Sequence, residues 1–127
     1  MNTPQQDYAL KEPSLAGASS DLSEQEDMMY GVISGNASEY SVWVSPKNRY
    51  GVHARPAAKI VRTASKYVQC EINAKKDSTQ ISASSIMGWM TLEAPCGSKI
   101  KLTAKGTDSK KALEEIVALF ESKFDEE

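Results

Sequence analysis

The sequence predicts an α+β fold of the open-faced β-sandwich type, in which a four-stranded antiparallel sheet is covered on one face by three helices. Three observations predict it. Four short segments have the composition of strands, and most of them alternate apolar with polar residues. Three other segments carry helix signals, and two of them have apolar residues at helical spacing. The resulting order is β-α-β-β-α-β-α, which favours a sheet with one face open to water.

The first strand is expected over residues 40–44, where larger side chains alternate with small or polar ones before Pro46. A helix is expected from Ala54 to about Tyr67, after a loop that Gly51 opens. Pro56 lies in the first turn of this helix, where its missing N–H removes no hydrogen bond. The apolar positions are Ala57, Ile60, Val61, Ala64 and Val68, and the opposite face carries Lys59, Arg62 and Lys66.

The remaining elements follow in the second half of the domain. Further strands are expected over residues 70–74, 79–83 and 99–104, and a short helix from Ile86 to about Leu92. Asp108 has the side chain of a good N-cap for the last helix. The stripe of that helix that should face the core comprises Ala112, Leu113, Ile116, Val117, Phe120 and Phe124.

Charge divides the chain into two parts. Residues 1–38 contain six acidic residues and one basic residue, whereas residues 39–127 contain 11 acidic and 14 basic residues. The first part has no sustained periodicity and too little apolar surface to offset the entropy lost on ordering. We expect an acidic, mostly disordered extension over 1–38 and a single domain over 39–127. A stray strand and a partner-docking element are two alternatives for the short apolar cluster at 28–33, but with no pattern around it we expect an unstructured, loosely packed segment.

Composition excludes several classes of protein. The two cysteines match no zinc motif, and a single histidine excludes a His-rich metal site, so we expect no metal and no cofactor. No apolar run approaches the roughly 18 residues that cross a bilayer, and the N-terminus does not have the pattern of a signal peptide. We therefore expect a cytoplasmic protein without membrane contact. A nucleic-acid-binding role is poorly supported, because the domain has a net charge of only +3 and no aromatic-basic strand motif.

The chemistry is concentrated in residues 51–57, Gly-Val-His-Ala-Arg-Pro-Ala. The first N–H groups of the helix, from Ala54 and Arg55, have no intrahelical partners, and the helix dipole favours an anion there. His53 at this position is suited to carry a phosphoryl group on a ring nitrogen. Arg55 adds a fixed positive charge and planar donors. The alternative is an exposed histidine without chemistry, which is the commoner case for a lone histidine.

Two segments resemble one protein family. Residues 51–58, Gly-Val-His-Ala-Arg-Pro-Ala-Ala, and residues 85–92, Ser-Ile-Met-Gly-Trp-Met-Thr-Leu, are similar to the motifs of HPr, the histidine-containing phosphocarrier of the bacterial phosphoenolpyruvate-dependent sugar phosphotransferase system. A weaker match runs through Gly97 and the turn at 104–108. The resemblance covers about residues 40–122 and none of the N-terminal extension.

The resemblance implies a set of roles. His53 would be phosphorylated on Nδ1 by phospho-enzyme I and would pass the group to an enzyme IIA domain, while Arg55 neutralises its charge. Ser85 would be the regulatory phosphoserine, the target of a serine kinase/phosphorylase. The residues matching the family's docking surface are Ile86, Met87 and Met90. We expect a monomeric carrier with no catalytic turnover of its own.

Three positions depart from the family pattern. Ser84 stands where the family often has lysine, which would weaken recognition by a kinase; Tyr50 and Trp89 stand where smaller residues are common. The alternative to a carrier is a regulatory adaptor of the same fold, whose partner binding depends on phosphorylation of Ser85. The presence of both His53 and Arg55 favours the carrier, because an adaptor has no use for that pair.

Overall fold

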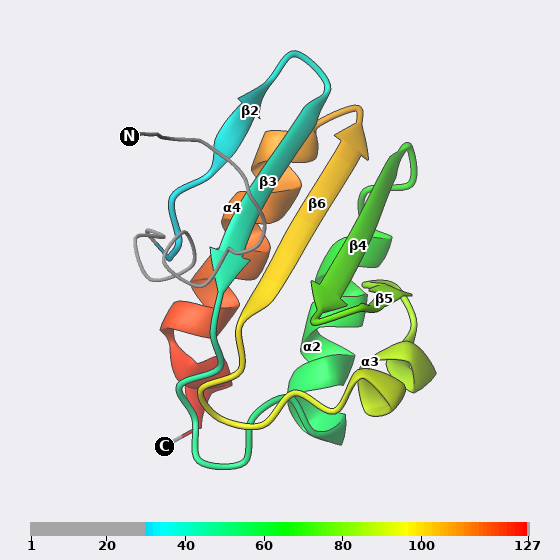
Figure 1. The fold of residues 1–127 in the computed structure, drawn as a ribbon. Helices are drawn as coiled ribbons and strands as arrows, with labels where there is room; N and C mark the ends of the chain where they lie inside the picture. The colour runs from blue at the N-terminus through cyan, green and yellow to red at the C-terminus, as the bar shows by residue number, and fades with distance from the viewer. Residues whose placement is uncertain (1–29, 127) are drawn as a thin grey trace, which may run out of the picture.

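The computed structural model describes residues 30–126. These residues form one antiparallel sheet of five strands in the order β2-β3-β6-β4-β5, with the helices on one of its faces (Figure 1). The strands are β2 Ser34–Asn36, β3 Glu39–Val44, β4 Cys70–Lys76, β5 Thr79–Ser82 and β6 Ile100–Gly106. The helices are α2 Ala54–Ser65, α3 Ile86–Leu92 and α4 Ser109–Glu121, followed by a 3₁₀ turn over Lys123–Asp125. The open-faced sandwich and the three helices are confirmed.

The strand alternation decides which face of the sheet is covered. In β6, Ile100, Leu102 and Ala104 are buried while the residues between them are more exposed. The same alternation buries Ile72 and Ala74 of β4. Helices α2 and α4 cover these residues, so the core lies between one sheet face and the helix layer (Figure 1). The largest core side chains are Trp89, Phe120 and Phe124. All residues of the stripe predicted for the last helix are buried, but Phe124 lies beyond the end of α4, in the turn Lys123–Asp125.

The sheet has one strand more than the four predicted. Strand β2 pairs with β3, with Ser34 opposite Ser41 and Asn36 opposite Glu39. It lies within the segment expected to be disordered, and Ile33 before it packs against the core. All three residues of β2 are exposed, so the strand is held by backbone pairing and leaves no apolar alternation to detect. Residues 1–29, which include Met28 and Met29 of the apolar cluster at 28–33, lie outside the described part of the chain.

Two smaller expectations are wrong. Helix α2 ends at Ser65, and Val68, expected on its apolar face, is 87% exposed. Asp108 does occupy the N-cap position of α4, but its backbone is left-handed (φ 60°) and its side chain caps no amide. In the part of the chain that the structure covers, no helix has the length and apolar character to span a membrane.

Candidate functional site

Three segments that are distant in the sequence meet at one end of the molecule. They are the loop between β3 and α2, the loop between α3 and β6, and the C-terminal turn after α4 (Figure 1). Backbone hydrogen bonds join the two loops, from Val52 N to Ala94 O (2.8 Å) and from Gly97 N to Pro46 O (2.9 Å). Gly51 permits this contact, because its φ is 66° and a Cβ there would lie 2.2 Å from Ala94 O. The position of the start of α2 is therefore fixed by hydrogen bonds between these two loops.

His53 is the N-cap residue of α2. Its backbone is extended (φ −90°, ψ −166°), and its carbonyl accepts the first helical hydrogen bond, from Ala57 N (2.9 Å). The next two N–H groups, from Ala54 and Arg55, have no hydrogen-bond acceptor among residues 30–126. Both residues are exposed, and Pro56 after them has no N–H. We call the N–H groups of Ala54 and Arg55 the open amides of α2, and they are suited to an anion.

The imidazole lies at the rim of an open depression. The His53 side chain is 39% exposed. Tyr50 packs edge-on against the ring at 6.1 Å between centroids, with the Arg49 guanidinium 5.3 Å from the Tyr50 centroid. Tyr50 is itself well exposed, so it forms one wall of the depression. The lining is completed by Arg55, Asp125 and Glu126.

The Nε2 atom of His53 contacts a carboxylate from the other end of the domain. It lies 3.1 Å from both Oε1 and Oε2 of Glu126. The amide of Asn48, which is fully buried, donates from Nδ2 to Glu126 Oε1 (3.0 Å) and to Gly51 O (2.8 Å). Both partners of Nδ2 are acceptors, which fixes the orientation of the amide. The hydrogen bonds from His53 and then Asn48 lower the pKa of Glu126, so the carboxylate is ionised at neutral pH.

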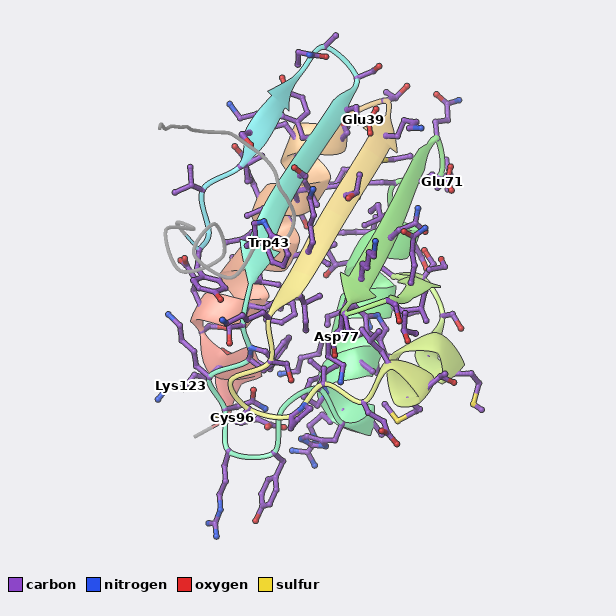
Figure 2. All side chains as sticks on the ribbon, in the orientation of Figure 1. Glu39, Trp43, Glu71, Asp77, Cys96 and Lys123 are labelled. Carbon is purple, nitrogen blue, oxygen red and sulfur yellow. The ribbon has the colours of Figure 1, made fainter. Side chains whose placement is uncertain are left out.

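The C-terminal turn that carries Glu126 is anchored to the core. Lys123, Phe124 and Asp125 have φ between 55° and 61°, a left-handed path that reverses the chain after α4. The ring of Phe124 is fully buried, 4.8 Å from Phe120 between centroids. Lys59 of α2 donates to Phe124 O (2.7 Å) and pairs with Asp125 (3.5 Å). Figure 2 shows Lys123 at the same end of the molecule as Cys96 in the loop after α3.

The second candidate phosphoacceptor, Ser85, lies at the start of α3. Its Oγ accepts a hydrogen bond from Gly88 N (2.9 Å), so the side chain caps the helix. Ser85 is half-buried, whereas Ser84 beside it is exposed. The Ser85 hydroxyl therefore already has a structural role.

The predicted docking residues differ in accessibility. Met87 is 73% exposed and Ile86 is also exposed, whereas Met90 is half-buried and packs against the core. Trp89 is fully buried, and its indole N–H donates to Ala83 O (3.1 Å). Trp89, which departs from the smaller residues common in the family, is thus a core residue. The apolar surface at α3 consists mainly of Ile86 and Met87.

The cations of α2 are not all available to a partner. Lys59 holds the C-terminal turn, and Lys66 pairs with Glu115 at 2.6 Å. Arg62 is exposed, as is Arg55 at the helix start.

Two residues of the site were not predicted, Asn48 and Glu126. Asn48 lies three residues before Gly51, a composition typical of a turn, and Gly51 N does donate to Asn48 O (3.1 Å). That signal indicates a turn but not a buried amide. Glu126 follows a left-handed turn beyond the last helix, where no periodicity locates its side chain.

Comparison with known proteins identifies the family. The family model described as the PTS HPr component phosphorylation site matches residues 43–122, a range that contains both helix starts. The chain belongs to the HPr family of phosphocarrier proteins of the phosphotransferase system.

Individual relatives agree with this assignment. The phosphocarrier protein HPr of Treponema pallidum is 48% identical over 80 residues, which cover 63% of this chain and 90% of the relative. The HPr-like protein Crh of Halalkalibacterium halodurans is 40% identical and covers 61% of this chain and 92% of its own. The crystal structure of HPr from Thermoanaerobacter tengcongensis superposes with a TM-score of 0.66 at 46% identity, covering 68% of this chain and 97% of that one. The matches therefore include nearly the whole length of each of these relatives and about two thirds of this chain.

Proposed function

We propose that His53 accepts a phosphoryl group on Nδ1 from phospho-enzyme I and passes it to an enzyme IIA domain, in the cytoplasm and as a monomer. One observation carries this proposal. The chain has a single histidine, it lies inside the family match, and it stands directly before the two open amides of α2. Because His53 is the single histidine of the sequence, a phosphohistidine can form at no other residue.

The surroundings of His53 suit a group that must be released again. The open amides of Ala54 and Arg55 and the Arg55 guanidinium provide positive potential for the phosphoryl oxygens. The site is exposed, so water screens these interactions and limits how tightly the group is held. Phosphoryl transfer needs mainly positioning and charge stabilisation. The chain then acts as a transfer intermediate without turnover of its own.

Partner docking is proposed for the surface formed by Ile86, Met87 and Met90. Methionine side chains adapt to differently shaped partners, which suits a carrier that meets a donor and several acceptors. Arg55 and Arg62 add exposed positive charge on α2. We therefore propose that enzyme I and the enzyme IIA domains present acidic and apolar groups to this side of the molecule.

The test is phosphorylation in a defined system. Enzyme I and phosphoenolpyruvate should transfer one phosphoryl group to the wild-type chain, and the phosphate should be labile in acid and stable in base. The His53→Ala variant should accept none. The proposal is wrong if the wild type stays unlabelled under conditions that label a known HPr, or if His53→Ala is labelled equally.

A second candidate function, regulation through Ser85, has one supporting observation. Ser85 is the N-cap of α3 and is adjacent to Ile86 and Met87, the most exposed residues of the proposed docking surface. A phosphate there would add a charge of about −1.5 to −2 beside an apolar contact. We propose that phosphorylation of Ser85 by a serine kinase/phosphorylase weakens docking. If this control is the main role of the chain and transfer through His53 is secondary, the chain acts as a regulatory adaptor.

Replacement of Ser85 by aspartate provides the test. Ser85→Asp should slow labelling of His53 by enzyme I, whereas Ser84→Asp, which adds the same charge one residue earlier, should slow it less. Equal labelling of Ser85→Asp and the wild type would remove the support for regulation at this position. Incubation with a serine kinase then asks directly whether Ser85 is a substrate.

A further inference from the structure

The contact between His53 and Glu126 determines which ring nitrogen is available. An ionised carboxylate only accepts hydrogen bonds, and both Glu126 oxygens lie 3.1 Å from Nε2. Nε2 must therefore carry the proton. The lone pair of the neutral ring is then on Nδ1, which makes no hydrogen bond within residues 30–126.

The geometry of Glu126 is maintained by groups outside the helix start. Asn48 binds Oε1 from a buried position, and the Glu126 side chain is only 17% exposed. Phe124, two residues earlier, is buried in the core, and Lys59 binds its carbonyl (2.7 Å). The carboxylate is thus fixed relative to the ring from three directions, which distinguishes this contact from a surface ion pair between two mobile side chains.

We propose that Glu126 is a positioning residue for phosphoryl transfer, holding the His53 tautomer that presents Nδ1 and stabilising the charge that the ring gains. The inference rests on the proposed phosphocarrier function. A carboxylate that orients an imidazole through one nitrogen while the other reacts is a general device in catalysis. Here the carboxylate comes from the C-terminal turn, beyond the matched range of 43–122.

The transfer can be written with its atoms and electrons balanced. In the accepting step the Nδ1 lone pair forms the N–P bond, and the bond between phosphorus and the donor breaks with its electron pair remaining on the donor. Nε2 keeps its proton, so the ring becomes positively charged beside the Glu126 carboxylate. In the donating step a nucleophile of the acceptor forms a new bond to phosphorus, the N–P electron pair returns to Nδ1, and the neutral Nε2–H ring is restored. No other reactant is needed.

The charge around the ring supports this assignment. Arg55 lines the same depression as His53 and Glu126, and Glu126 contacts the imidazole at Nε2, on the opposite edge from Nδ1. A carboxylate near the incoming phosphoryl group would repel it, whereas a carboxylate at Nε2 stabilises only the ring. Glu126 can therefore assist the transfer without competing for the open amides.

The first measurement is ¹⁵N NMR of the imidazole, which is unambiguous because the chain has one histidine. The wild type should show the Nε2–H tautomer, with the Nε2 proton protected from solvent exchange by its hydrogen bond. Glu126→Ala should lose that protection. Glu121→Ala is the matched control, since Glu121 is an exposed carboxylate at the end of α4, close in sequence, and lies outside the lining of the His53 depression.

The second measurement is the rate of phosphorylation by enzyme I. Glu126→Ala should be slowed about tenfold, the effect of losing one hydrogen bond to a charged group in a half-exposed site. Glu126→Gln should be intermediate, because its amide oxygen still accepts from Nε2 but carries no charge. Glu126→Asp should recover part of the rate, and Glu121→Ala should match the wild type.

Three results would overturn the inference: an Nδ1–H tautomer in the wild type, equal rates for Glu126→Ala and Glu121→Ala, or faster phosphorylation of Glu126→Ala, which would make Glu126 an obstruction. Failure of the proposed function looks different. In that case the wild type itself accepts no phosphoryl group, while the tautomer measurement still decides whether Glu126 holds the ring.

Discussion

The starts of α2 and α3 each present a candidate phosphoacceptor, but their side chains are held in opposite ways. The Ser85 hydroxyl turns back onto its own helix and accepts from Gly88 N. The His53 ring caps no amide of α2 and contacts Glu126, 73 residues along the chain. The Ser85 side chain therefore stabilises its own helix as a cap, whereas His53 can change its chemical state without loss of a helix cap.

Replacing the acceptor itself should have the largest effect. His53→Ala should abolish phosphoryl acceptance, while the melting temperature should fall by less than about 3 °C because no cap is lost. Phosphorylation by enzyme I and thermal unfolding by circular dichroism measure the two quantities. A collapse of the fold in His53→Ala would show that the ring is structural, as Ser85 is, and would erase the contrast between the two helix starts.

Arg55 comes next in expected effect. Arg55→Ala should slow phosphorylation about tenfold, since one charge-assisted interaction with the phosphoryl oxygens is lost at an exposed site. Arg62→Ala is the comparison, because it also removes an exposed charge of the same helix but about two and a half turns from His53, so that any slowing should come only from weaker docking. If both variants are slowed equally, Arg55 acts only through the overall charge of α2.

Loss of the cap should affect stability and not chemistry at the ring. Ser85→Ala removes the Oγ that Gly88 N requires and should lower the free energy of unfolding by about 1 kcal/mol. Urea unfolding measures this, with Ser84→Ala as the control. Labelling of His53 should be nearly unchanged in Ser85→Ala. An unchanged stability would mean that α3 does not depend on its cap.

The pH dependence of the Glu126 contact gives the smallest effect. The pKa of Glu126 is lowered by His53 and Asn48, so folding favours the ionised carboxylate. Its stabilising contribution is present above the ordinary carboxyl pKa and is lost as pH falls through the lowered value. The charged or titratable groups around it are His53 and Arg55. The stability difference between the wild type and Glu126→Gln, from urea unfolding, should therefore shrink as the solution is acidified. A difference that does not depend on pH would contradict the assignment.

The features of the fold and the site that could be predicted from the sequence are those marked by residues nearby in the chain. Pro56 in the first turn and apolar residues at helical spacing place the start of α2 at Ala54, so the position of His53 beside the amides follows from nearby residues. The same holds for Ser85 before the short α3. The alternation of β4 and β6 predicts which face of the sheet is covered, because burial repeats every second residue.

The unpredicted features depend on contacts across the chain. Strand β2 joins the sheet through its backbone while its side chains stay exposed, so no hydrophobic pattern marks it. Glu126 reaches His53 only because three left-handed residues turn the chain and Phe124 anchors it in the core. Such a path is set by tertiary packing and not by local preference. Asn48 can be assigned to the site only from its hydrogen bond to Glu126, which depends on that turn.

The most direct test compares backbone amides before and after phosphorylation in a ¹H–¹⁵N spectrum. The open amides of Ala54 and Arg55 should move strongly downfield when the phosphoryl group forms on Nδ1, as they gain an anionic acceptor. The amide of Gly88, already bound to Ser85 Oγ, should not move. Phosphorylation of His53 that leaves Ala54 and Arg55 unchanged would contradict the claim that this helix start holds the transferred group.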